Sequence, residues 1–241
     1  MSVLEISSIS KSFAMRGGLF NKSLPAKKYE QSLVLDNVSL AVHEGQILGV
    51  IGCNGAGKTT LFRILADLLS ADTGIVAISG KNRELLGRSY RSLIGYVSSD
   101  ERSFFWRLTG RENLEFFARL HGMSPGKARA TADRQIVKFD FAAKADELFR
   151  DYSAGMRKKL TVMRAIMHSP RLLLLDEVTN SLDPESSRMI KKFVTSYVKE
   201  KAGIAALWST HRLEELDQVC DAWVTIENGR LSANAGHFNE K

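Results

Sequence analysis

The amino-acid sequence predicts an α/β fold with a mainly parallel sheet. Two observations predict it. Short apolar runs with strand character alternate with segments of helical periodicity, and a longer helical stretch interrupts this alternation in the middle of the chain. At 241 residues, the chain has room for one large domain or for a core with a satellite subdomain.

The first part of the chain is expected to consist of strands and one helix. A polar, glycine-containing excursion at 14–31 separates the first two strands. The expected strands are 2–13, 33–42, 46–52, 74–80 and 93–99. The helix is expected at 57–69. Its apolar residues recur on one face, at Leu61, Ile64, Leu65 and Leu68.

The middle of the chain is helical from about Thr109 to Ser169. The helical segments are 111–122, 127–139 and 154–168. Strands and helices then alternate again, at 171–177, 184–200, 203–210, 213–219 and 222–228. The helical middle is therefore expected to be an insertion into the sheet domain.

Composition indicates a chain that works without membrane spans of its own. The longest apolar runs, such as 172–175, are too short to cross a bilayer, and the first ten residues lack the features of a signal peptide. The two cysteines, Cys53 and Cys220, have no metal-binding or disulfide spacing. A net charge of +7 without a recognisable nucleic-acid module leads us to expect no nucleic-acid partner.

A glycine-rich loop at 52–60 matches the pattern G-x-x-x-x-G-K-[ST] between an apolar strand and a helix. Such a loop curls backbone N–H groups around phosphate oxygens at a helix amino terminus. Lys58 would neutralise the β- and γ-phosphates, and Thr59 would ligate Mg²⁺. The residues expected to bind nucleotide are Gly52, Asn54, Gly55, Ala56, Gly57, Lys58, Thr59 and Thr60.

Two carboxylates and a histidine follow later strands. Asp176 ends the apolar run LLLLDE and suits a contact to Mg²⁺, and Glu177 could act as general base on an attacking water. An acidic pair in this place is by itself more often a cap or a solvated loop, but the phosphate loop favours the catalytic interpretation. His211 follows the strand at 203–210, where it could contact the γ-phosphate and orient the water.

A second stretch, DYSAGMRKKL at 151–160, also has the character of a phosphate-binding helix start. A small, flexible Ser-Ala-Gly turn leads into a basic helix. In this order, the segments GCNGAGKTT, YSAGM, LLLLDE, NSLD and STH resemble the nucleotide-binding subunit of ABC transporters. The resemblance covers nearly the whole chain, and YSAGM occupies the place of the family signature.

The resemblance implies a P-loop NTPase core with a mainly parallel sheet, an N-terminal antiparallel β subdomain and an inserted helical subdomain. The chain would be one nucleotide-binding domain at 1–241, with the helical subdomain at about 99–169. It would bind ATP and Mg²⁺ and hydrolyse ATP.

The resemblance also implies a homodimer in which each ATP lies between one phosphate loop and the other subunit's signature. Ser153 and Gly155 would then grip the γ-phosphate of the partner's ATP. Asp183 would lie at the dimer seam and could at the same time cap a helix that starts at Pro184.

The sequence leaves alternatives for three assignments: the residue that stacks on adenine, the residue that replaces a family Gln, and the role of an aromatic cluster. The family stacks an aromatic residue on adenine, and Phe13 is the best match; Phe20 or Tyr29 could serve instead, and Phe13 could simply pack in the core. The family's Gln after the strand at 93–99 is absent. The residues that could replace it are Ser98, Ser99, Asp100 and Glu101. The aromatic cluster SFFWR at 103–107 is either a socket for a partner helix or internal packing.

We therefore expect an ATPase subunit at the cytoplasmic face of the cell membrane, bound to a separate membrane-spanning permease. The YSAGM form with the long excursion looks like exporters of polysaccharides and related glycoconjugates, and the stretch at 98–117 looks like exporters near the drug-efflux type. The alternative is a soluble ABC-type ATPase that acts on nucleic acid or ribosomes.

Overall fold

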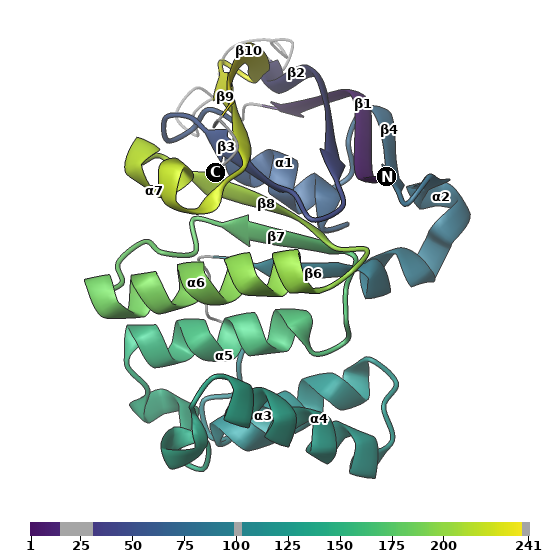
Figure 1. The fold of residues 1–241 in the computed structure, drawn as a ribbon. Coiled ribbons are helices and arrows are strands. Elements are labelled where there is room, and N and C mark those ends of the chain that lie inside the picture. The colour runs from purple at the N-terminus through teal and green to yellow at the C-terminus, as the bar shows by residue number, and fades with distance from the viewer. Residues whose placement is uncertain (15–30, 99–102, 238–241) are drawn as a thin grey trace, which may run out of the picture.

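The computed structural model describes residues 1–14, 31–98 and 103–237. In this part of the chain, six strands form the larger sheet, in the order β10-β9-β3-β8-β7-β6 (Figure 1). Their bounds are Arg230–His237, Ala222–Glu227, Ile47–Ile51, Ala205–Thr210, Leu172–Asp176 and Ile94–Val97. All neighbouring pairs are parallel except β9 and β10. The predicted mainly parallel sheet is confirmed.

The smaller sheet is antiparallel and belongs to the first half of the chain. Its order among the described residues is β2-β1-β4-β5. The bounds are Gln31–His43, Ser2–Ala14, Thr73–Ile78 and Lys81–Asn82. This sheet is the predicted N-terminal antiparallel subdomain.

Helix α1 (Lys58–Leu65) covers one face of the larger sheet, and α5 (Ala154–Ile166), α6 (Pro184–Glu200) and α7 (Leu213–Val219) cover the other. The short α2 (Arg83–Leu86) lies beside the smaller sheet, and α3 (Gly110–Leu120) and α4 (Pro125–Lys138) pack on each other next to α5 (Figure 1). Short 3-10 turns occur at η1 (Gly87–Leu93), η2 (Ala142–Lys144) and η3 (Phe149–Asp151). Among the described residues, no helix combines the length and the apolar character that a membrane span needs.

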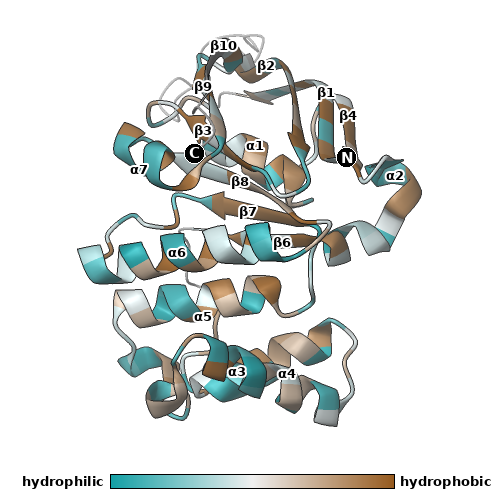
Figure 2. Ribbon diagram, viewed as in Figure 1, coloured by the Kyte–Doolittle hydropathy of each residue, from teal (hydrophilic) through white to brown (hydrophobic). Residues whose placement is uncertain are grey.

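Strand β7 shows how the sequence builds two cores around one sheet. Its side chains alternate between the faces, so Leu173 and Leu175 join the core beneath α5 and α6, while Leu172 and Leu174 join the core that holds α1 and the smaller sheet. A strand buried on both faces needs a continuous apolar run, which is why β7 is brown along its length in Figure 2.

Helix α1 is shorter than the sequence predicts. Leu61, Ile64 and Leu65 are buried as expected, but the helix ends at Leu65, and Leu68 is 62% exposed. The backbone of Asp67 turns into the left-handed region, with φ at 58°, which stops helical propagation. The apolar period therefore ends at the helix end, and the predicted place of Leu68 on the buried face is wrong.

The helical middle of the chain lies between β6 and β7. Helix α3 begins with a capping box: the Thr109 hydroxyl accepts a hydrogen bond from the Glu112 N–H, and the Glu112 carboxylate accepts one from the Thr109 N–H. Arg111 forms ion pairs with Asp133 of α4 and with Asp146. Local caps and cross-connections thus hold α3 and α4 together beside α5.

Candidate active site

The loop from Gly52 to Gly57 joins β3 to α1, and its glycines are required by geometry. The Gly57 backbone lies in the left-handed region at φ 110°, and a Cβ there would lie 2.8 Å from the carbonyl oxygen of Val34. A Cβ at Gly52 would collide with the carbonyl oxygen of Ile226. The pattern found in the sequence therefore reflects a backbone path that larger residues could not follow.

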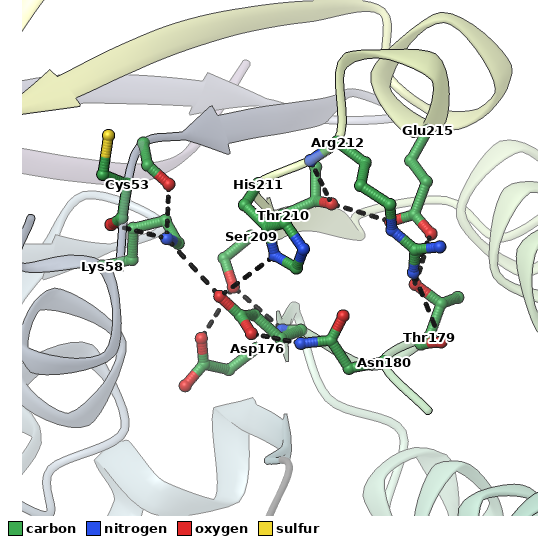
Figure 3. A network of polar contacts seen from close by, with 12 residues as sticks. Cys53, Lys58, Asp176, Thr179, Asn180, Ser209, Thr210, His211, Arg212 and Glu215 are labelled. Atoms are coloured by element: carbon green, nitrogen blue, oxygen red, sulfur yellow. Dashed lines mark hydrogen bonds and ion pairs between the residues drawn. The ribbon is translucent and has the colours of Figure 1, made fainter. Parts of the chain in front are cut away.

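Lys58, the first residue of α1, folds back across the loop. Its Nζ donates hydrogen bonds to the carbonyl oxygens of Gly52, at 2.7 Å, and Cys53, at 3.1 Å. The same nitrogen lies 3.4 Å from Glu177 Oε1 (Figure 3). Lys58 is 4% exposed, so its charge acts in a largely desolvated place.

A cavity of about 350 Å³ lies over this loop. Its lining residues are Val34, Asn54, Gly55, Gly57, Lys58, Thr59, Thr60, Asp176 and Glu177. The structure thus brings most of the predicted loop residues together with both carboxylates. Gly52 and Ala56 belong to the loop but do not line the cavity, and neither do Phe13 and His211.

Asp176 ends β7 as a buried carboxylate. It is 2% exposed, and the Ser209 hydroxyl donates a hydrogen bond to its Oδ1 at 2.6 Å. Burial raises the pKa of Asp176, and hydrogen bonds from the hydroxyls of Ser209 and Thr59 oppose that rise. A cation near Asp176 and Thr59 would stabilise the charged carboxylate.

The described residues contain no group of three or more His, Cys, Asp and Glu side chains that could hold a metal ion by themselves. Asp176 and Thr59 nevertheless supply the oxygen donors that suit Mg²⁺, which commonly keeps waters and phosphate oxygens as its other ligands. The donor set fits a magnesium ion that arrives with a nucleotide.

Glu177 follows β7 in a backbone conformation that is unusual for glutamate, with φ at 48°. Its N–H donates a hydrogen bond to the Ser209 hydroxyl at 2.9 Å, and Glu177 lines the cavity. The Asn180 amide donates a hydrogen bond to Oε2, and His211 Nδ1 lies 3.8 Å from Oε1 (Figure 3). The carboxylate therefore has one oxygen held by Asn180 and the other facing Lys58 and His211.

The predicted signature lies away from the cavity. Ser153 is the N-cap of α5, and its hydroxyl accepts a hydrogen bond from the Met156 N–H at 3.2 Å. A Cβ at Gly155 would press on the Ser186 hydroxyl of α6. Asp183 caps α6 by accepting a hydrogen bond from the Ser186 N–H at 2.9 Å. In one chain, Ser153 and Gly155 do not meet the phosphate loop.

Phe13 stands at the end of β1 and is 41% exposed, with Lys11 Nζ 5.5 Å from the ring centre. The alternative that Phe13 packs in the core is therefore wrong, because its ring is open to solvent. The other aromatic candidates, Phe20 and Tyr29, lie outside the described residues. So do Ser99, Asp100 and Glu101 among the candidates to replace the missing Gln.

The loop after β6 is connected to α5. Lys158 of α5 is 3% exposed, and its Nζ donates a hydrogen bond to the Ser98 carbonyl oxygen at 3.1 Å. The aromatic cluster that follows is divided: Phe104 is buried and stacks on Phe149 at 4.8 Å, while Trp106 is 50% exposed. Internal packing is therefore confirmed for Phe104, whereas the socket for a partner helix stays a prediction that would involve the exposed Trp106.

A model of the ABC transporter family matches residues 35–180. The chain belongs to the ABC transporter family. It is 32% identical over 195 residues to the ABC transporter ATP-binding protein NatA of Bacillus subtilis, covering 81% of this chain and 78% of that protein. The daunorubicin resistance ATP-binding protein DrrA3 of Streptomyces coeruleorubidus is 38% identical over 207 residues. That match covers 86% of this ABC protein and 65% of the relative.

A solved structure has the same fold. It is a dimeric ATP-binding cassette in a post-hydrolysis state bound to ADP and Pi, with a TM-score of 0.83 and 20% sequence identity. The match covers 99% of this ABC protein and 100% of that chain. Together the comparisons confirm the predicted family, the P-loop NTPase fold class and the protein class of an ATP-binding ATPase subunit.

Several site residues of this ABC protein were missed by sequence reasoning. Val34 lines the cavity from β2, and Ser209 holds Asp176 and Glu177 from β8. Thr179 and Asn180 follow Glu177 within three residues, and Asn180 opens the segment NSLD, so their closeness in sequence was a usable signal. Ser209 opens the segment STH, but its contacts with the two carboxylates had no signal in the sequence, and neither had the place of Val34, because only the fold brings them to the site.

Proposed function

We propose that this chain is the subunit of an exporter that binds ATP with Mg²⁺, dimerises around it and hydrolyses it to drive a membrane-spanning permease. The observation that carries the proposal is the cavity in which the phosphate loop, a buried Asp176 and an oriented Glu177 face one another. ATP binding itself follows from the family. The metal, the dimer, the membrane location and the substrate are the proposed parts.

The phosphate groups would lie against the amino terminus of α1. Backbone N–H groups of the loop and the helix dipole favour negative charge there, and Lys58 adds a full positive charge. Because Glu177 lies 3.4 Å from Lys58 Nζ, phosphate oxygens would compete with that carboxylate for the lysine. Nucleotide binding would thus release Glu177 toward the attacking water.

Thr59 and Asp176 would hold the magnesium ion. Bound Mg²⁺ would neutralise charge on the transferring phosphoryl group. Asp176 contributes a carboxylate that is costly to keep charged in its buried place, so a cation and the Asp176 anion would stabilise each other.

Glu177 would take a proton from the attacking water. Oε1 faces the cavity side with Lys58 and His211, whereas Oε2 is held by the Asn180 amide. His211, at 3.8 Å from Oε1, stands where its ring could orient the water and contact the γ-phosphate. Proton transfer by a positioned side chain contributes about 100- to 10,000-fold to a rate.

Dimerisation would bring the signature of one chain to the nucleotide of the other. Ser153 and Gly155 do not line the cavity of their own chain, which supports a role toward a partner. Exposed Phe105 and Trp106 support a docking place for the permease beside the helical middle. The drug-resistance relative supports export of a lipophilic compound, and the YSAGM form supports a glycoconjugate.

The test is Glu177→Gln, compared with the matched control Glu200→Gln at the exposed end of α6. The glutamine amide keeps the shape of the side chain but cannot accept the proton, so we expect ATP binding to persist while turnover falls about 100-fold or more. Size-exclusion chromatography with ATP should show a dimer. Turnover close to that of the control would overturn the assignment of Glu177, and a strictly monomeric ATP complex would overturn the dimer.

A further inference from the structure

Glu215 is a buried carboxylate to which the mechanism above gives no part. It lies in α7, and its side chain is only 5% exposed. The Thr179 hydroxyl donates a hydrogen bond to Oε1 at 2.6 Å, and the Thr210 hydroxyl donates one to Oε2 at 2.8 Å. Arg212 Nη2 lies 2.9 Å from Oε1, which completes the set of donors (Figure 3). A buried anion is stable only with such partners.

The two threonines come from the two segments that carry the reacting groups. Thr179 lies two residues after Glu177 and directly before Asn180, while Thr210 ends β8 directly before His211. Both threonines are 2% exposed. Glu215 therefore connects the turn after β7 to the end of β8 through its two carboxylate oxygens.

These contacts close a ring around the site. Asn180 holds the Glu177 carboxylate, Thr179 and Thr210 hold Glu215, and His211 faces Glu177 at 3.8 Å. Neither threonine nor Glu215 lines the nucleotide cavity. The ring thus connects the neighbours of Glu177 and His211 through groups that do not line the cavity.

The hydroxyl geometry of the ring leaves little freedom. The Thr210 hydroxyl donates to Glu215 and at the same time accepts the Arg212 N–H at 3.1 Å, so its orientation is fixed. Arg212 Nη2 also lies 3.4 Å from the Thr179 carbonyl oxygen. Fully satisfied buried polar groups hold one arrangement of their loops, because any shift leaves a donor or the carboxylate unpaired.

We propose that Glu215 is a positioning residue, which keeps Glu177 and His211 in register for hydrolysis by binding Thr179 and Thr210. This inference rests on the proposed role of Glu177 as general base. It differs from a purely structural role of Glu215 in anchoring α7, because it predicts that catalysis changes more than nucleotide binding or stability.

The experiment compares hydroxyl-free with hydroxyl-bearing variants of the two threonines. Thr179→Val and Thr210→Val keep the shape but lose the donor, and we expect each to lower kcat about tenfold while KM for ATP stays within about twofold. Thr179→Ser and Thr210→Ser keep the hydroxyl and should restore kcat. Since one break already opens the ring, the double valine variant should lose little more than either single variant.

A matched control is Thr131→Val in α4, another threonine that is 2% exposed and hydrogen-bonded, to Arg134, but remote from the cavity. It should leave kcat unchanged. Wild-type kcat in both folded valine variants would overturn the inference. So would equal losses in Thr131→Val, or serine variants that fail to recover. Because Glu177→Gln is measured beside them, turnover retained in that variant would instead refute the proposed function itself.

Discussion

The loops that precede α1 and α5 both lead into the amino terminus of a helix, yet they are built differently. The first uses Gly57 in the left-handed region with no side-chain cap, so its N–H groups face an open cavity. The second uses Ser153 in an extended conformation, and the serine hydroxyl binds the Met156 N–H. The first loop stands with its carboxylate partners in one chain. The second lies outside that cavity, beside the turn of α6 that Asp183 caps, and the proposed ATP contact of Ser153 would therefore be made toward another chain.

Among the variants that test this difference between the two loops, Lys58→Ala should have the largest effect. The control is Lys81→Ala, which replaces an exposed lysine of β5. Lys58 is a buried cation that faces the cavity, so its loss should weaken ATP binding about 100-fold, equivalent to about 2.7 kcal/mol. Isothermal titration with a nonhydrolysable ATP analogue measures the change. Unaltered affinity would show that the first loop does not hold the phosphates.

A histidine contact at the end of α5 should make the region of α5, unlike the phosphate loop, sensitive to acid. His168, just past α5, has Nε2 2.9 Å from the Ile94 carbonyl oxygen of β6 and stacks on His121 at 4.0 Å. Burial lowers the pKa of His168 to about 4. In the unfolded chain, the His168 ring becomes protonated as the pH falls below its ordinary pKa of about 6.5. In the folded chain, the same ring becomes protonated only near pH 4.

Stability should therefore fall as the pH decreases from 6.5 to 4. Between pH 7.5 and pH 5, the His168 contribution amounts to about 2 kcal/mol of unfolding free energy. In the variant His168→Gln, the loss of about 2 kcal/mol between pH 7.5 and pH 5 should disappear. In the control variant His43→Gln, which replaces an exposed histidine, the same loss should remain. Urea unfolding at the two pH values tests this, and an identical loss in His168→Gln would contradict it.

Two substitutions of Ser153 separate its capping role from its proposed contact with the partner's ATP. Ser153→Ala removes the cap, which costs about 1 kcal/mol of stability. Ser153→Asp keeps a capping oxygen but brings a negative charge toward the phosphates. We expect hydrolysis in Ser153→Asp to fall about tenfold at near-normal stability, with ATP binding to the monomer retained. Undiminished hydrolysis in that variant would leave α5 with a structural role alone.

The smallest effect is expected at Trp106. Its ring is half-exposed, and Arg157 lies over it at 4.8 Å. Trp106→Ala should lower the unfolding free energy by no more than about 1 kcal/mol and leave the ATPase activity of the isolated chain unchanged. Phe104→Ala, in contrast, removes a buried ring and should cost about 3 kcal/mol. Thermal unfolding of the two variants compares them directly.

Much of the architecture was predictable, because strand and helix periodicities are local. The strands at β3, β6 and β7 and the helices α6 and α7 were placed within a residue or two. Strand β10 was missed, since its sequence of small and polar residues carries no strand pattern and it gains order by pairing with β9. The end of α1 was misplaced because the apolar period continues to Leu68 beyond the turn at Asp67.

For the site, motifs located the loop and the two carboxylates but not what surrounds them. Ser209 and Glu215 contact the turn after β7 across more than thirty residues of sequence, Ser209 through the parallel pairing of β7 and β8 and Glu215 from α7. Polar side chains in such places look ordinary in a sequence, and only the fold makes them neighbours.

The close approach at Gly155 has a mechanical consequence. With the Ser186 hydroxyl where a methyl group would have to go, the first turn of α5 and the first turn of α6 are in contact without a gap. Asp183 caps that same turn of α6. A displacement that begins at Ser153 therefore pushes directly on the start of α6, so the two helix ends would shift together as one rigid piece.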